Sequence, residues 1–372
     1  MVGWWRRGII RGRLVSGLTA TRADQFAGRV PRIVRTAVTP AGVMVSLKLH
    51  PGHSGIQVEG RLPELAAAAK AHAVRVDTSR RSRAHRIRLH VITRDVLTEP
   101  VQWADLHADR LSMWDPVHLG TVDDGRTWRF SLVERSLLVA GQPGAGKSNL
   151  LQLVVAHASL SSDAQIVCID PSEVQLSAHR GRCLAYAGAD IGDATAAVEL
   201  VHDEMTRRLA WMSTAGGRKL DRSMPWPLLV FAVDELSYHL TIAGTGQQRA
   251  VWGATVRDVV ARGRAAGIIT VIATQRPTND VVPASLSGLF SVRAAGRVSS
   301  RADSDRVLGD GMARSGYDAS TIGLASRGVM VATSDHDVAV RFRAAWLSDD
   351  QVREVARRAV HVPAAVADAA AA

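Results

Sequence analysis

Cysteine is scarce in this chain, because 372 residues include only Cys168 and Cys183. Two thiols are too few for a disulfide framework, and their surroundings do not resemble a metal cluster. A reducing compartment is the expected setting for such a chain. We therefore predict a cytoplasmic protein.

Long apolar runs are also missing, since no stretch approaches the roughly 20 apolar residues that span a bilayer. Near the start, Arg6 and Arg7 precede a short apolar stretch, but Arg11 and Arg13 interrupt it and no small-residue cleavage site follows. We interpret residues 1–29 as a basic arm that contacts DNA, a neighbouring subunit or, peripherally, a membrane. Simple disorder is the alternative.

Acidic residues are outnumbered, with 35 Asp and Glu against 46 Lys and Arg, which gives a formal net charge of +11. An excess of this size favours a polyanionic partner, either nucleic acid or an anionic membrane surface. A genome that prefers arginine codons would produce the same excess. Charge alone favours nucleic acid over that alternative.

Residues 30–98 have the pattern of a small α/β domain. Two alternating segments flank a Pro-Ala-Gly turn, an alanine-rich helix follows, and two more alternating segments end the unit. This order predicts a ββαββ unit with elements at 33–39, 43–49, 62–72, 73–77 and 86–93. Residues 99–117 are interpreted as a connector.

From residue 118 to 361 the sequence pattern changes and indicates apolar strands that alternate with amphipathic helices. Near-continuous apolar runs are typical of parallel strands buried on both faces, and they occur at 137–140, 166–170, 228–234 and 268–274. Helices are expected at 148–159, 192–214, 247–266 and 349–360. This alternation predicts a doubly wound α/β core, and residues 362–372 read as a disordered tail.

A complete phosphate-binding loop, called the P-loop below, joins the first of these strands to the first helix. Its residues are Gly141, Gln142, Pro143, Gly144, Ala145, Gly146, Lys147 and Ser148. Glycines let the backbone N–H groups surround phosphates, and the helix N-terminus favours negative charge. Lys147 is expected on the β- and γ-phosphates of ATP, and the Ser148 hydroxyl on Mg²⁺.

Two acidic residues, Asp234 and Glu235, end the strand at 228–234. Beside a P-loop strand, Asp234 would lie near the hydration shell of Mg²⁺, and Glu235 would polarise the attacking water as general base. A strand that merely ends in solvated acids is the alternative, and the complete P-loop argues against it.

Two further polar residues are candidates for the same site. Gln275 follows the strand at 268–274, where its amide would sense the γ-phosphate; a simple cap between strand and loop is the alternative. Arg297 lies late in a predicted edge strand and has no acidic partner nearby in the sequence. It would stabilise a transition state in a neighbouring subunit, or else be solvated.

Several segments together resemble the FtsK/SpoIIIE family of double-stranded-DNA translocases. The resemblance covers roughly residues 119–360 and is carried, in order, by 169–171, 204–208, 261–268, 273–277 and 297–304. Members of that family form hexameric rings that thread duplex DNA while hydrolysing ATP. The resemblance implies a RecA-like motor domain and makes Arg297 the residue that completes the neighbouring site.

The chain departs from the cell-division members of that family. We see no membrane-spanning segment at the start and no room for a C-terminal winged helix after the last predicted helix. The short form with a ββαββ unit looks most like the conjugative DNA-transfer proteins of actinobacterial plasmids and integrative elements.

The sequence thus predicts an ATP-driven, ring-forming DNA motor without a transmembrane segment. Its expected partners are double-stranded DNA and further copies of itself. A protein-export ATPase of the same motor family and a chromosome-segregation pump are the alternatives. DNA contacts are expected to be mainly with phosphates and so to depend on salt. The residues expected to make them are Arg218, Lys219, Arg222, Arg262 and Arg264.

Overall fold

The computed structural model describes residues 31–77, 85–108, 110–215, 220–334 and 339–363, together with residues 8, 10, 12, 13, 15 and 16. Most of the predicted basic arm, the end of the tail, Arg218 and Lys219 lie outside the described residues. Within the described part, no helix is both long and apolar enough to cross a membrane.

The first unit is a four-stranded antiparallel sheet in the order β1-β2-β4-β3. This confirms the predicted ββαββ order, with two short helices between the strand pairs. The predicted helix at 62–72 ends early, at Ala69, because Lys70 adopts a left-handed conformation with φ of 50°. The elements are β1 (Arg32–Thr39), β2 (Gly42–Lys48), α2 (Gly55–Glu59), α3 (Leu62–Ala69), β3 (Ala73–Val76) and β4 (Arg86–Ile92).

The second unit is built on an 11-stranded sheet, in the order β10-β9-β11-β12-β8-β13-β14-β15-β6-β7, with β5 paired to β15. The first six strands of that order are parallel and form the P-loop α/β core, which confirms the predicted fold class. The strands are β5 (Val101–Gln102), β6 (Val117–Val122), β7 (Thr127–Phe130), β8 (Ser136–Ala140), β9 (Ala164–Ile169), β10 (Ala185–Ala187), β11 (Leu228–Val233), β12 (Ile268–Thr274), β13 (Val292–Ala295), β14 (Val329–Ser334) and β15 (Ala339–Trp346).

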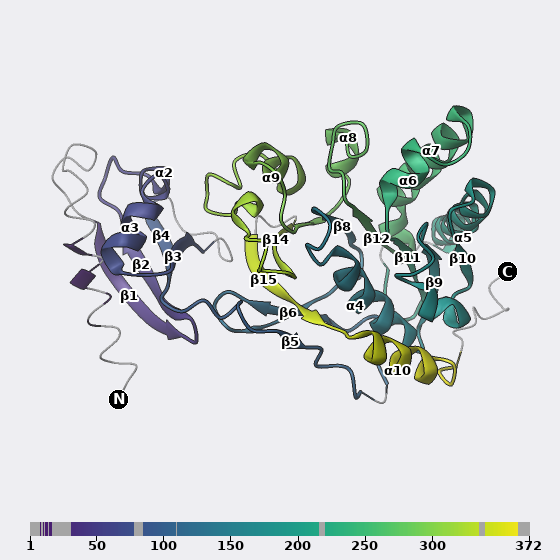
Figure 1. The fold of residues 1–372 in the computed structure, drawn as a ribbon, viewed down its shortest axis with the longest axis horizontal. Coiled ribbons are helices and arrows are strands. Elements are labelled where there is room, and N and C mark those ends of the chain that lie inside the picture. Colours follow the sequence, from purple (N-terminus) through teal and green to yellow (C-terminus); the bar gives the residue numbers. More distant parts are fainter. Residues whose placement is uncertain are drawn as a thin grey trace.

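Helices cover both faces of the parallel strands, so the strands are apolar on both sides. On β8, Leu137 and Val139 pack in the cluster under α4 and α10, whereas Leu138 packs in the cluster under α5, α6 and α7. Figure 1 shows α4 and α10 on one side of the sheet and α5 to α9 on the other. The helices are α4 (Lys147–Ser159), α5 (Ile191–Ala215), α6 (Leu236–Thr241), α7 (Gly246–Arg262), α8 (Ala284–Ser287), α9 (Arg301–Leu308) and α10 (Asp349–Ala359), with short 3₁₀ turns η1 (Ser177–Arg182), η2 (Gly263–Ala266) and η3 (Ala319–Thr321).

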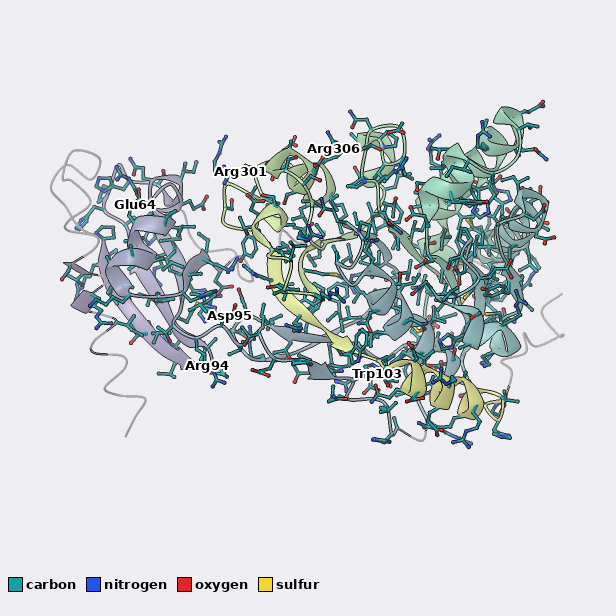
Figure 2. The ribbon with its side chains drawn as sticks, in the orientation of Figure 1. Glu64, Arg94, Asp95, Trp103, Arg301 and Arg306 are labelled. Atoms are coloured by element: carbon teal, nitrogen blue, oxygen red, sulfur yellow. The ribbon has the colours of Figure 1, made fainter. Side chains whose placement is uncertain are left out.

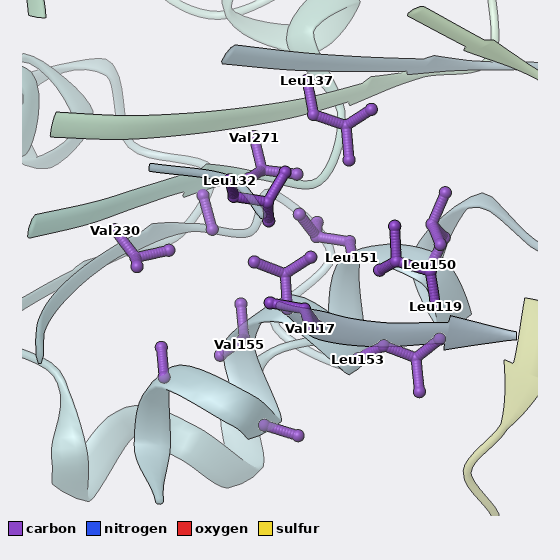
Figure 3. Packing of buried hydrophobic residues seen from close by; sticks show 14 of the residues in the cluster. Val117, Leu119, Leu132, Leu137, Leu150, Leu151, Leu153, Val155, Val230 and Val271 are labelled. Atoms are coloured by element: carbon purple, nitrogen blue, oxygen red, sulfur yellow. The ribbon is translucent and has the colours of Figure 1, made fainter. Parts of the chain in front are cut away.

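Helix α4 is the central packing element, because it begins in the P-loop and is almost wholly buried. Its residues Leu150, Leu151 and Val155 belong to the same cluster as Leu137 of β8 and Val271 of β12. Figure 3 shows these side chains gathered between the helix and the strands. The orientation of the P-loop is therefore fixed by a well-packed core.

The predicted connector at 99–117 contributes to this larger core. Strand β5 pairs with the end of β15, and both Trp103 and Met113 are buried in the cluster around α4. Figure 2 shows the chain leaving the small unit at Arg94 and Asp95 and reaching the large sheet near Trp103.

The two units also touch directly. Arg75 of β3 forms a 2.8 Å ion pair with Asp123, which follows β6, and donates to the carbonyl of Gly316. The Tyr317 hydroxyl donates to the carbonyl of Val76 over 2.8 Å. The segment between α9 and β14 therefore holds the small unit against the large one.

A buried arginine ties α5 to the start of β12. The Arg208 side chain is fully buried, donates to Glu204 over 2.6 Å and to the carbonyl of Ala266 over 3.0 Å, and lies over the Trp226 ring. Burial lowers the pKa of Arg208, while the hydrogen bond that it donates to Glu204 opposes that shift. Its neighbour Arg207 also contacts Glu204, but is 43% exposed.

These two arginines give a matched test. Arg208→Ala removes a fully buried side chain and leaves the carbonyl of Ala266 without this donor, while Glu204 keeps its pair with Arg207. We therefore expect a loss of about 2–5 kcal/mol in the free energy of unfolding. Arg207→Ala removes an exposed pair and should cost less than about 1 kcal/mol. Chemical denaturation of both variants measures the difference, and equal losses would contradict the structural role assigned to Arg208.

Candidate nucleotide site

The P-loop lies between β8 and α4, and its backbone is attached to the ends of neighbouring strands. Gly141 donates its N–H to the carbonyl of Thr274 at the end of β12, and Gln142 donates to the carbonyl of Arg297 just after β13. The amide of Gly328 donates to the carbonyl of Ala145 over 3.2 Å. Three separate segments thus set the shape of the loop.

Gly146 is required by the geometry of this loop. It has φ of 98°, and a Cβ added there would lie 2.8 Å from the Cα of Gly328. Since real Cβ atoms essentially never approach so closely, only glycine fits without movement of the turn at 328. Gly146 is also the N-cap of α4, and the first N–H groups of that helix would donate to an anion bound in the loop.

Lys147 is buried and its amino group donates to the carbonyl of Gln142 in the same loop, over 3.1 Å. Burial lowers the pKa of Lys147, and the nearby carboxylates of Glu235 and Asp234 oppose that shift. The amine is thus held inside the loop, where phosphates are expected to bind.

Asp234 follows β11 and lies close enough to Ser148 of the P-loop for that side chain to act on the pKa of its carboxyl group. Burial raises the pKa of Asp234 to about 6; the Ser148 hydrogen bond lowers it, and the neighbouring carboxylates of Asp170 and Glu235 raise it further. Asp170 itself is fully buried and accepts hydrogen bonds from Ser172, Leu176 and Tyr186.

These residues fit a Mg²⁺ ion. The Oδ1 atom of Asp234 is buried and has no hydrogen-bond partner within the described part of the chain, so an acceptor there is left free for a metal-bound water. Ser148 supplies a hydroxyl and Asp234 a carboxylate, and oxygen ligands are those that Mg²⁺ prefers. When bound, the ion would neutralise charge on the phosphates; Ser148 would hold it directly and Asp234 through water.

Glu235 is the N-cap of α6, and its carboxylate is held in place by three residues. It accepts hydrogen bonds from the Ser237 hydroxyl at 2.6 Å, the Thr274 hydroxyl at 2.9 Å and the backbone N–H of Gln275 at 2.9 Å. The tips of β11 and β12 are therefore coupled through this one side chain. The Gln275 side chain lies elsewhere, on the wall of the cavity that contains the P-loop.

Arg297 corrects one expectation about the strands. We predicted it late in an edge strand, but β13 ends at Ala295 and is flanked by β8 and β14, so it is an interior strand. The backbone of Arg297 holds the P-loop of its own chain, and the half-exposed side chain makes no ion pair or hydrogen bond with any residue that the structure describes.

The predicted DNA-contacting arginines that are described lie on the surface. Arg222 pairs with Asp115 over 3.0 Å, and Arg262, at the end of α7, pairs with Asp258. Arg264 lies in η2 and is half-exposed. The structure does not bring these residues into the P-loop site, and their contact with DNA stays a prediction.

A cavity of about 670 Å³ opens beside the P-loop, within the size range of small-molecule sites. The sequence analysis missed much of its wall, namely Asn149 of α4, the turn residue Arg327, and Arg343 and Trp346 of β15. The only local signal was Asn149, directly after the P-loop. The other three residues come from segments that no short motif marks.

Comparison with known proteins agrees with this geometry. Residues 114–226, which include the P-loop, match the model of the FtsK/SpoIIIE family. A DNA translocase FtsK of Staphylococcus aureus is 29% identical over 240 residues, covering 59% of this chain and 29% of that protein. The corresponding protein of Streptococcus agalactiae is 26% identical over 348 residues, covering 87% of this chain and 41% of that protein.

This chain therefore spans less than half the length of the FtsK proteins that it matches. Among solved structures, the pCW3 conjugation coupling protein TcpA shares the fold with a TM-score of 0.61 at 14% identity, over 93% of this chain and 99% of that chain. The type VII secretion ATPase EccC of Thermomonospora curvata has a TM-score of 0.53 at 21% identity, over 72% of this chain and 33% of that one.

Lys147 gives a direct test of the site. Lys147→Ala removes a buried charged donor from the loop and should weaken binding of an ATP analogue by about 10- to 100-fold. Lys48→Ala, which removes one exposed charge at the end of β2, is the matched control and should bind normally. Isothermal titration calorimetry measures the affinity of both variants for the analogue. An unchanged affinity in Lys147→Ala would show that the phosphates bind elsewhere.

Proposed function

We propose that this chain is an ATP-driven motor that moves double-stranded DNA. The observation that carries the proposal is the arrangement of Lys147, Ser148 and Asp234 in a P-loop site of an FtsK/SpoIIIE segment. The relatives that match in sequence are named DNA translocases. The net charge of +11 is consistent with a polyanionic substrate.

The reaction is ATP hydrolysis, and the residues of this chain act by position and charge. The P-loop amides and Lys147 hold the β- and γ-phosphates, and Glu235 orients and polarises the attacking water. Because Thr274 and Gln275 both donate to Glu235, the carboxylate has one orientation relative to β12. The Gln275 side chain, on the cavity wall, is assigned the role of sensing the γ-phosphate.

We assign the role of completing a neighbouring site to Arg297. Its side chain is not among those that line the cavity of its own chain, and its backbone is fixed by Gln142. A ring of copies would present this fixed arginine to the next subunit, where it stabilises charge in the transition state. Ring assembly, and a hexamer in particular, is part of the proposal.

The finer proposal is DNA transfer in conjugation. TcpA, a conjugation coupling protein, has the same fold along nearly its whole length. The alternative of protein export is favoured by one observation, the shared fold with the type VII secretion ATPase EccC. Chromosome segregation is the other alternative, since the FtsK relatives carry the same motor segment.

Steady-state ATP hydrolysis with and without long duplex DNA tests the motor. We expect DNA to stimulate turnover, and Lys147→Ala and Arg297→Ala each to abolish it. Mixing the two variants should restore part of the activity, because a mixed interface combines an intact P-loop with an intact arginine. A mixture as inactive as its components would place Arg297 in its own site, and hydrolysis indifferent to DNA would favour protein export.

A mating assay tests the conjugative role. A donor whose copy of this chain carries Lys147→Ala should transfer its mobile element at least about 100-fold less often, since one lost catalytic group removes that much rate or more. The donor's own chromosome should segregate normally, and Lys48→Ala should transfer at the normal frequency. Normal transfer with anucleate cells would favour the segregation pump.

A further inference from the structure

The lining of the cavity beside the P-loop includes two sets of residues of different chemistry. The first set is the phosphate-binding residues Gly144, Gly146, Lys147 and Ser148. The second set is apolar and comprises Pro100, Trp346, Leu347 and Val352, and the polar residues Gln152, Gln175 and Asp349 line the same cavity.

Trp346 is the large aromatic residue of the apolar set. It is 51% exposed, although most other large apolar side chains of this unit are buried. It is the last residue of β15, and β5 runs parallel beside it, with Trp346 opposite Gln102. Trp346 is thus placed by two paired strands, and it lines the same cavity as the P-loop.

Asn149 fixes the backbone at Trp346 relative to the P-loop. It follows Ser148 in the first turn of α4, and its amide nitrogen donates to the carbonyl of Ala345 over 2.6 Å. Its Oδ1 accepts the backbone N–H of Leu347 over 3.2 Å. One side chain therefore bonds the backbone on both sides of Trp346, and ties it to the residue after the P-loop serine.

We infer that Trp346 is the stacking platform for the base of the nucleoside triphosphate whose phosphates bind the P-loop. The inference rests on the proposed nucleotide site and adds where the base lies. Any base offers a π-face to an aromatic ring, and a purine offers the larger one. Pro100, Leu347 and Val352 supply the apolar surroundings, and Asn149 is a positioning residue.

Two ligands separate the base from the phosphates. Inorganic tripolyphosphate with Mg²⁺ carries the phosphate chain alone, whereas ATPγS with Mg²⁺ carries the base and sugar as well. Trp346→Ala should weaken ATPγS by about 10-fold, the size of one aromatic–base contact, and leave tripolyphosphate unchanged. Trp346→Phe keeps an aromatic face, and its affinity for ATPγS should stay within about threefold of that of the wild-type protein.

Val251→Ala is the matched control, because Val251 of α7 is 50% exposed and lies outside the cavity. It should bind both ligands normally. Lys147→Ala should weaken both, since it acts on the phosphates that they share. Comparing ATPγS with the corresponding UTP analogue adds a second readout: the preference for the purine should shrink in Trp346→Ala.

Each result decides the inference. Equal weakening of both ligands in Trp346→Ala would mean that the ring supports the loop and does not hold the base. Unchanged binding of ATPγS would place the base elsewhere in the cavity. If the wild-type protein binds tripolyphosphate as tightly as ATPγS, the base contributes no affinity. Trp346 is then not a platform for the base, although the phosphates still bind the P-loop. If it binds neither ligand, the proposed nucleotide function fails as well.

Discussion

The backbone hydrogen bonds that hold the P-loop are the constraint on which the rest of the site depends. Three backbone hydrogen bonds hold the loop in place. They join Gly141 to Thr274, Gln142 to Arg297, and Ala145 to Gly328. These partners come from three different strand ends or turns. A parallel sheet brings such ends to one edge, so the sheet order itself places the P-loop, the acidic residues and the backbone of Arg297 together.

The buried charges of the site follow from that placement. Lys147 and Asp234 are both buried, and burial disfavours the charged form of each group. It therefore lowers the pKa of Lys147 and raises the pKa of Asp234. Their mutual attraction opposes the shift, and Ser148 provides a donor to the carboxyl. A bound phosphate chain would place negative charge beside Lys147, and its counter-ion would place positive charge beside Asp234. The site is therefore selective for an anion with a bound cation.

Local patterns predicted the core but not the wall of the site. The apolar runs at 137–140 and 268–274 and the P-loop are continuous in sequence, so periodicity and spacing found them. The β14–β15 pair was not predicted as strands, and so β13 was wrongly expected at an edge. Trp346 was missed because its role depends on Asn149, 196 positions away from the carbonyl of Ala345 that it bonds. No short pattern encodes a contact of that range.

The segment from α9 to β14 joins the small unit to the nucleotide site. Gly316 and Tyr317 bond the small unit through Arg75 and Val76, and the same segment continues to Gly328, which bonds Ala145 of the P-loop. Its middle is fixed on α9, since Ala319 donates to Ser304. Because packed cores resist continuous deformation, a shift of the turn at Gly328 has to be taken up within this short segment or passed on to the small unit. The small unit is thus mechanically part of the P-loop's surroundings, although it contributes no residue to the cavity.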